Sequence, residues 1–108
     1  MATYPPGTIA VIFISQRADA DEDGYDAAAN EMAELVQRQP GYLGVDSVRE
    51  ANGLGITVSY WADEASAIAW RDNEEHSAIR DRGRAGWYVH YDTVIARVTR
   101  SYDWTKVP

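Results

Sequence analysis

The sequence predicts an α+β fold in which strands and helices follow the order β-α-β-β-α-β. Three observations lead to this class: an apolar, β-branched run near the N-terminus, two stretches with the apolar spacing of amphipathic helices, and a hairpin signal between them. A chain of 108 residues is long enough for one hydrophobic core. We therefore expect a single domain over residues 1–108.

The first strand and the first helix are expected in the N-terminal third of the chain. The run "TIAVIFISQ", Thr8 to Gln16, is almost continuously apolar, which is typical of a strand buried on both faces. Helical spacing follows, and Pro40 and Gly41 in "QPGY" end it. The apolar stripe of this helix consists of Tyr25, Ala28, Met32, Leu35 or Val36, and Gln39.

Two further strands are expected to form a hairpin in the middle of the chain. The runs "YLGVDSVRE" and "LGITVSYW" are joined by "ANG", in which Asn52 and Gly53 tolerate positive φ. A second helical region extends from about Asp63 to Gly86, with an interruption near Asn73. The segment "YDTVIARVTRSYDW" then predicts a long final strand.

This order of elements is the split arrangement of ferredoxin-like domains, in which a four-stranded antiparallel sheet carries both helices on one face. The first and third strands are apolar on both sides. A second copy of the chain would explain the apolar face that the helices leave open, so we expect a homodimer.

Composition and charge exclude several classes of function. The net charge is −7 and the isoelectric point is near 4.6, which disfavours binding to nucleic acid or to anionic membranes. The chain has no cysteine, so disulfides, thiolate metal sites and cysteine nucleophiles are excluded. No apolar run has the roughly 20 residues of a membrane span, and the N-terminus lacks the pattern of a signal peptide. A cytoplasmic location is the default expectation.

Familiar catalytic and metal-binding motifs are incomplete or missing. Asp19, Asp21 and Asp23 alternate before Gly24 as in a calcium loop, but the twelfth position is Asn30 instead of the bidentate Glu that such a loop needs. We interpret this segment as an acidic loop before a helix N-terminus. The glycines of "GLGITV" do not form a dinucleotide fingerprint, and no H-E-x-x-H or G-x-S-x-G motif occurs.

The second helical region contains the first candidate site residue, His76. If residues 74–87 are helical, then His76, Ile79, Gly83 and Trp87 share one stripe, with Arg80 beside it. A histidine among aromatic side chains can be a general base with a shifted pKa. It can equally be a core histidine whose ring is satisfied by a backbone carbonyl, and the spacing does not decide between the two.

Other residues of interest lie around this stripe. Gly83 and Gly86 cost about 1 kcal/mol each in a helix interior, so they indicate close packing, a break or room for a ligand. Trp70 is expected to face the space between helices and sheet, and Arg49 and Tyr60 are candidates for the mouth of the same cavity.

The chain resembles the antibiotic biosynthesis monooxygenase (ABM) family of the dimeric α+β barrel superfamily. The resemblance covers nearly the whole length and rests on "QPGYLGVDSVRE", "GITVSYWADEASAIAW", "EHSAIRDRGRAGWY" and "ARVTRSYDW", in that order. It implies a homodimer in which two sheets face each other as a barrel, with one pocket per subunit between helices and sheet. Family members have diverse reactions, so the resemblance is more specific for the fold than for the chemistry.

The resemblance also implies a kind of chemistry. Oxygenases of this family are thought to use no metal and no flavin: a bound phenol or hydroquinone loses a proton, and its anion passes an electron to O₂. Such a protein needs an aromatic pocket, a base and a group that stabilises negative charge. On this basis His76 and Arg80 are the expected catalytic residues, and the expected substrate-binding residues are Tyr60, Trp70, Trp87 and Arg49. The substrate would be a small aromatic, polyketide or quinol-type molecule.

Two alternatives remain at this stage. Haem-degrading relatives carry an iron-ligating histidine about ten residues after the helix tryptophan, but here Arg80 stands ten residues after Trp70 and His76 comes about one turn too early. A haem-binding or haem-degrading protein is therefore the weaker reading. The other alternative is a non-catalytic dimer that binds a small ligand or is purely structural.

Overall fold

The described residues form four strands and three α-helices, and their order along the chain is that of a split βαβ unit. The structure is a computed structural model that describes residues 3–18 and 22–108. Asp19 and Asp21 of the calcium-like spacing lie outside these residues, as does the side chain of Asp23. The strands are β1 (Ile9–Arg17), β2 (Tyr42–Arg49), β3 (Leu54–Trp61) and β4 (Tyr88–Arg97), and the helices are α1 (Glu22–Gln37), α2 (Glu64–Asp72) and α3 (Glu74–Arg82).

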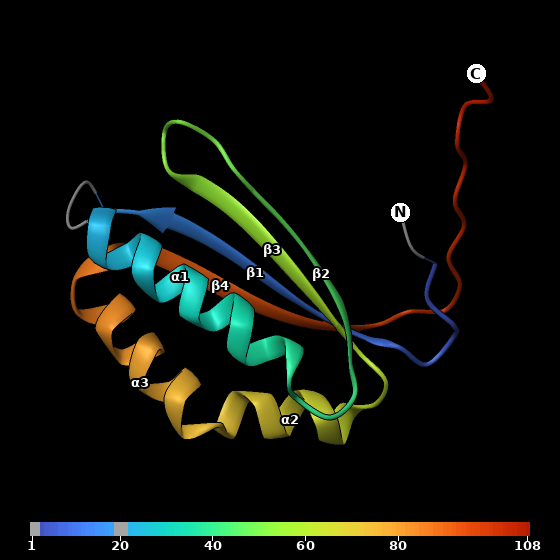
Figure 1. Cartoon of the computed structure of the whole chain (residues 1–108), viewed down its shortest axis with the longest axis horizontal. Coiled ribbons are helices and arrows are strands. Elements are labelled where there is room, and N and C mark those ends of the chain that lie inside the picture. Colours follow the sequence, from blue (N-terminus) through green and yellow to red (C-terminus); the bar gives the residue numbers. More distant parts are fainter. Residues whose placement is uncertain (1–2, 19–21) are drawn as a thin grey trace.

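The sheet is antiparallel throughout, with the order β2-β3-β1-β4. The helices lie together on one side of it, so the predicted ferredoxin-like α+β fold is confirmed (Figure 1). The expected hairpin is present, and Gly53 in its turn has a φ of 93°, which a glycine adopts without strain. This arrangement places β1 at the centre of the sheet and β2 at one edge.

The main core lies where α1 and α2 cross the sheet. Trp61 at the end of β3 is completely buried, and its ring stacks on that of Trp70 with centroids 6.0 Å apart. The indole Nε1–H of Trp61 donates to the Ser59 hydroxyl at 2.9 Å, which satisfies its polar edge. The remaining buried members of this cluster are Ile9, Leu35, Val36 and Ala67.

A second, smaller core lies under the opposite end of α1. Ala28, Ile79 and Trp87 are buried there, and the half-buried Met32 packs against both cores. The helical stripe predicted for α1 and the Ile79–Gly83–Trp87 stripe therefore face the interior. Gly83 begins a π-helical turn, Gly83–Trp87 (η1), which ends the helical region immediately before β4.

The predicted interruption at Asn73 is also confirmed. Its backbone is extended, with φ −60° and ψ 129°, and it separates α2 from α3. The side-chain oxygen of Asn73 accepts a hydrogen bond from the His76 backbone N–H at 3.1 Å and so caps α3. Asp63 caps α2 in the same way through the Ser66 N–H at 2.7 Å.

The last strand lies earlier in the chain than the sequence pattern predicts. The pattern indicates residues 91–104, but β4 is Tyr88–Arg97, because its register follows β1 from Arg17 opposite Tyr88 to Ile9 opposite Arg97. Pairing stops soon after, since Pro5 and Pro6 precede β1 and proline has no N–H to donate. The chain beyond extends away from the body (Figure 1).

The face of the sheet opposite the helices is open. Ile12 and Ile14 on this face of β1 are half-buried, whereas Val48, Leu54, Ile56 and Val94 on the other strands are exposed. The C-terminal extension adds three large apolar side chains with exposures of 81–83%, namely Tyr102, Trp104 and Val107. Apolar surface of this extent is typical of an interface.

Candidate functional site

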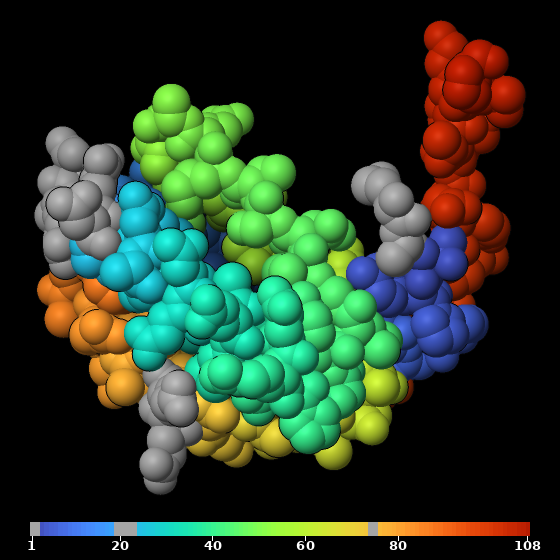
Figure 2. All heavy atoms as spheres, viewed as in Figure 1, coloured from blue at the N-terminus to red at the C-terminus, as the bar shows by residue number. Residues whose placement is uncertain are grey.

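The helix side of the sheet contains a groove between α1 and the β2–β3 hairpin. The molecular surface is hollowed there, and atoms of β1 are visible at the bottom (Figure 2). By register, Val45 and Ser59 face this side together, as do Ser47 and Thr57, whose hydroxyls hydrogen-bond at 2.7 Å. Val45 is 43% exposed although it is on the helix side, because α1 does not extend over the hairpin. The groove therefore has apolar and hydroxyl-bearing side chains along its length.

Arg49 lies at the end of this groove, near the tip of the hairpin. Its guanidinium Nη2 donates to the Ser15 hydroxyl at 3.0 Å and to the Tyr25 hydroxyl at 3.1 Å, and its Nη1 donates to the Gly53 carbonyl. Ser15 is buried on the central strand, and Tyr25 comes from the first turns of α1. A single side chain thus joins β2, β1, α1 and the hairpin turn.

Gly55 on β3 leaves the space in which the Arg49 side chain crosses from β2 to β1. It stands between Arg49 and Ser15 in the sheet, opposite both. A Cβ at position 55 would come within 2.7–2.9 Å of Cζ, Nη2 and Nη1 of the Arg49 guanidinium. The guanidinium therefore lies flat over β3 only because residue 55 has no side chain.

Tyr25 contacts further aromatic and basic side chains at the same end of the groove. The Arg17 guanidinium carbon lies 3.7 Å from the Tyr25 ring centroid, and the Trp87 ring lies 6.0 Å away edge-on. Tyr88 packs edge-on against Tyr25 at 6.2 Å. Burial, followed by the interaction with Tyr25, raises the pKa of Tyr88 well above its usual value, so this phenol stays protonated at neutral pH.

His76 is not part of the groove. Its ring stacks on Trp70 with centroids 4.3 Å apart, and its Nδ1 lies 2.9 Å from the Trp70 carbonyl oxygen. A carbonyl can only accept, so Nδ1 carries the hydrogen and Nε2 has the free lone pair. Burial lowers the pKa of His76, the nearby charge of Arg80 lowers it further, and the hydrogen bond to Trp70 opposes the shift.

Arg80 lies beside His76 on α3. Its Nη2 donates to the Ser77 hydroxyl at 3.3 Å, and its Nη1 is 3.5 Å from the Arg71 carbonyl. The Nε is buried, and no acceptor for it lies in the described part of the chain. The two expected catalytic residues are therefore close to each other and to Trp70, but no hydrogen bond or ring contact within the described residues joins them to Arg49.

Tyr60 lies on the open face of the sheet, away from both groups. Its ring stacks on Tyr4 with centroids 3.9 Å apart, and its hydroxyl donates to Asp46 at 3.3 Å. Burial and the Asp46 charge raise its pKa. The structure thus separates the six expected site residues into three places. Arg49 and Trp87 adjoin Tyr25. Trp70, His76 and Arg80 lie together at the α2–α3 junction, and Tyr60 is on the other side of the sheet.

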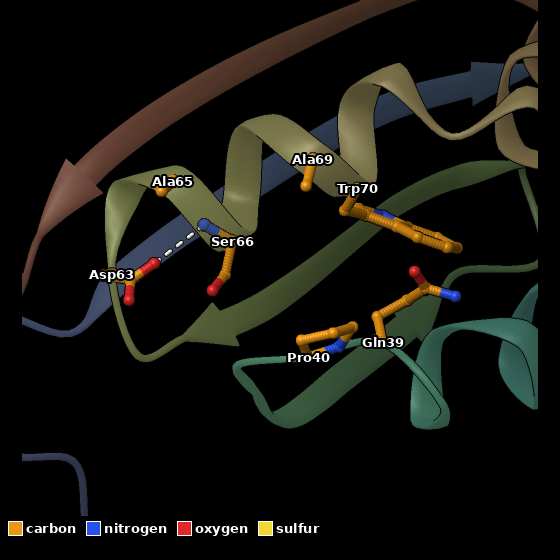
Figure 3. Close-up of a pocket in the computed structure, with 7 residues that line it drawn as sticks. All are labelled: Gln39, Pro40, Asp63, Ala65, Ser66, Ala69 and Trp70. Atoms are coloured by element: carbon orange, nitrogen blue, oxygen red, sulfur yellow. Dashed lines mark hydrogen bonds between the residues drawn. The ribbon is translucent and has the colours of Figure 1, made fainter.

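A second concavity lies beside Trp70. It has a volume of about 250 Å³ and opens between α2 and the loop that follows α1 (Figure 3). Its lining residues are Gln39, Pro40, Asp63, Ala65, Ser66, Ala69 and Trp70. The carboxylate of Asp63 is the one ionisable group in this lining, and it is engaged as the cap of α2, so the pocket offers less chemistry than the groove.

Sequence reasoning named Arg49 and Trp87 but missed the partners that make the groove a site. The sequence places Ser15 and Gly55 in strands, gives Gly55 no part in a dinucleotide fingerprint, and shows Tyr25 only as a member of the α1 stripe. The predicted split arrangement already puts β3 between β1 and β2, but the sequence does not show that Ser15, Gly55 and Arg49 stand opposite one another in the register of these strands. The one available signal was Gly55 itself, because a glycine inside a strand often marks a close approach of another group.

The described residues carry no grouping of three or more His, Asp or Glu side chains that would hold a metal ion. Within the same part of the chain, no helix is both long and apolar enough to cross a bilayer.

Comparison with known proteins places the chain in a family. The family model described as antibiotic biosynthesis monooxygenase matches residues 8–82. The uncharacterized protein YqjZ of Bacillus subtilis is 46% identical over 98 residues, which is 91% of this chain and 85% of that protein. The jasmonate monooxygenase ABM of Pyricularia oryzae is 26% identical over 96 residues, and the match covers 85% of this chain but 44% of that longer protein.

Solved structures agree with the fold. SnoaB, a cofactor-independent oxygenase from Streptomyces nogalater, superposes with a TM-score of 0.72 at 12% identity, covering 92% of this chain and 96% of that one. Protein SO0527 from Shewanella oneidensis gives 0.77 at 8% identity, covering 93% and 98%. At these identities the likeness concerns the fold alone, whereas the match of the family model extends over more than half of the sequence. The chain belongs to the antibiotic biosynthesis monooxygenase family.

Proposed function

We propose that this protein is a cofactor-independent monooxygenase that oxidises a small aromatic, polyketide or quinol-type substrate with O₂ in the groove between α1 and the β2–β3 hairpin. The observation that carries the proposal is the groove itself, which combines apolar and hydroxyl-bearing side chains with the Arg49 guanidinium at one end. Family membership supports the reaction class. The names of two relatives, a jasmonate monooxygenase and a cofactor-independent oxygenase, support it further.

The groove suits an electron-rich ring. Thr57 faces the helices from β3, and Val45 faces the same side from β2. A flat substrate between these side chains and α1 would be shielded from water on two sides, and the Arg49 charge would stabilise an anion. The deprotonated substrate would then pass an electron to O₂.

Two groups are candidates for accepting the proton of the substrate. His76 has a free Nε2 and a lowered pKa, so it is neutral and able to accept a proton at neutral pH. It lies at the α2–α3 junction and not on the groove, however. The other candidate is water, because the Arg49 charge lowers the pKa of a bound phenol or enol and the groove is open to solvent.

The active assembly in this proposal is a homodimer joined through the open faces of the sheets. Val48, Leu54, Ile56 and Val94 supply the apolar surface. The helix-side groove stays accessible in such an assembly, since the two faces of the sheet are separate.

The haem-binding alternative has less support. Arg80 stands ten residues after Trp70, and the Nδ1 of His76 is already bound to the Trp70 carbonyl. Mixing the protein with haemin tests it directly, because haem ligation by a side chain would produce a shifted Soret band.

Oxygen uptake tests the leading proposal. Anthrone-type, naphthol and hydroquinone compounds are to be screened with an oxygen electrode, using metal-free, flavin-free protein. Uptake that depends on the protein and falls in Arg49→Gln supports the groove as the site. Full activity in His76→Ala assigns proton removal to water, and loss of activity with retained folding assigns it to His76. If no compound of these classes gives uptake although some bind, the protein is a ligand-binding dimer and the oxygenase proposal fails.

A further inference from the structure

We propose that the groove selects ligands that carry a carboxylate next to an apolar ring, and that Arg49 is the residue that binds this carboxylate. The inference rests on the proposed function only in taking the groove as the ligand site. Carboxylate binding does not require that the ligand is oxidised.

The hydrogen bonds of Arg49 leave part of its guanidinium unused. A guanidinium has five N–H donors. Three of them are engaged, by the hydroxyls of Ser15 and Tyr25 and by the Gly53 carbonyl. Two N–H groups therefore have no acceptor among the described residues, and the exposed side chain can present them to a ligand.

The charge of Arg49 is also uncompensated within the described part of the chain. All three of its acceptors are neutral, and no described carboxylate lies within ion-pair distance of it. Three other arginines do contact carboxylates, in the pairs Arg71–Asp72, Arg82–Glu31 and Arg97–Glu64.

The guanidinium is held in place before any ligand arrives. Ser15 is 1% exposed and lies on the central strand, so it is a fixed anchor. Gly55 provides the flat space in which the guanidinium lies. A pre-positioned arginine loses little side-chain freedom on binding, and this favours affinity.

The chemistry of the groove favours a carboxylic acid over a phenol. The acid is ionised at neutral pH and the phenol is not, so only the acid brings a full negative charge to the guanidinium. The neighbouring wall includes Val45, which suits a ring or chain attached to the acid. The Arg17 guanidinium carbon lies 3.7 Å from the Tyr25 ring centroid, so a second positive charge is near this end of the groove.

Binding of matched probes tests the inference. Isothermal titration measures the affinity of 2-naphthoate, its methyl ester and 2-naphthol at neutral pH, where only the first is an anion. We expect the wild-type protein to bind 2-naphthoate at least about tenfold more tightly than the ester or the naphthol. Arg49→Gln should reduce this preference to less than about twofold. Arg97→Gln is the control, because it removes an equal charge at the other end of the sheet.

A second variant separates ligand binding from loss of folding. Gly55→Ala keeps every charge but displaces the Arg49 guanidinium, and a flexible side-chain end can move without unfolding the sheet. It should lose the carboxylate preference while its circular dichroism spectrum and melting curve stay close to those of the wild type. Equal binding of ester and acid, a preference that survives in Arg49→Gln, or no saturable binding of 2-naphthoate at millimolar concentration would each overturn the inference. Carboxylate binding without O₂ uptake would leave it standing and count only against the oxygenase proposal.

Discussion

His76 lies face to face with Trp70, with ring centroids 4.3 Å apart and an interplanar angle of 23°, and its Nδ1 donates to the carbonyl of the same tryptophan. The contact joins the end of α2 to the start of α3 across the break at Asn73. The neutral form of a histidine in this position stabilises the junction between α2 and α3. Its free Nε2 nevertheless keeps the lone pair that a base requires.

The stability of the protein should fall below pH 6.5 in a way that depends on His76. The pKa of His76 is lower in the folded chain than its usual value of 6.5, so the unfolded chain binds more protons in this range. The neutral ring contributes its stability above pH 6.5, and the contribution is lost as the pH falls toward the folded pKa. Urea unfolding of the wild type and of His76→Gln at a series of pH values measures the difference. His90→Gln, which removes an exposed histidine, is the control, and an identical pH dependence for all three proteins would contradict the prediction.

Replacing Asn73 should loosen α3. Its side-chain oxygen accepts from the His76 N–H, and loss of such a cap costs about 1 kcal/mol. We therefore expect Asn73→Ala to lower the free energy of unfolding by about that amount in chemical denaturation. Asn73→Asp retains the acceptor and should remain within a few tenths of a kcal/mol of the wild type. Equal losses in both variants would show that the cap does not stabilise the junction.

The two glycines near the end of the helical region should respond differently to alanine. A Cβ on Gly83 would lie 2.8 Å from the Tyr88 ring, so Gly83→Ala should destabilise the protein by about 1–3 kcal/mol through overpacking. A Cβ on Gly86 meets nothing within 4 Å. Gly86→Ala should thus be neutral or stabilise by up to about 1 kcal/mol, because it restricts the unfolded chain. Thermal melts of both variants provide the comparison, and a larger loss in Gly86→Ala would refute it.

The buried Trp61 should depend on the hydroxyl of Ser59. Removing that hydroxyl leaves the indole N–H of a fully buried ring without its partner, which costs about 1–3 kcal/mol. Ser59→Ala should therefore lower the free energy of unfolding by this amount. Ser47→Ala removes an exposed hydroxyl and is expected to change it by less than about 0.5 kcal/mol.

The open face of the sheet should mediate self-association. Ile56 on this face and Ile68 on α2 are both 42% exposed, so they form a matched pair. Analytical ultracentrifugation at micromolar concentration should show a dimer for the wild type and for Ile68→Asp, and a monomer for Ile56→Asp, because a buried unpaired charge is costly at an apolar interface. A monomeric wild type, or a dimeric Ile56→Asp, would exclude this face.

The fold could be predicted from the sequence because its main signals are local. The turn at Gly53, the break at Asn73 and the apolar stripe of α1 each depend on a few neighbouring residues and on a known backbone or packing preference. The bounds of β4 were less accessible. They depend on the register with β1, and apolar residues continue past Arg97 into the extended C-terminal segment.

The candidate site was harder to predict because strand alternation does not say which face the helices cover. Tyr60 and Ser59 are neighbours in sequence, yet Tyr60 faces the open side and Ser59 faces the core. On β3 the apolar residues Leu54, Ile56 and Val58 share a face with Tyr60, so the alternation favours burial of the face that the helices leave open. Likewise, Arg49 and Tyr25 are 24 residues apart, and they meet only through the crossover of α1 over the sheet.

The path of Arg49 has a consequence for the dynamics of the molecule. The side chain starts on an edge strand and ends on the central one, so the hairpin cannot fray without first withdrawing the guanidinium from Ser15. Edge hairpins are ordinarily among the first parts of a sheet to open, and their amides exchange with solvent fastest. A ligand that binds Arg49 and restricts its motion should accordingly slow amide exchange along β2 and around Gly53, at backbone positions that the ligand does not contact.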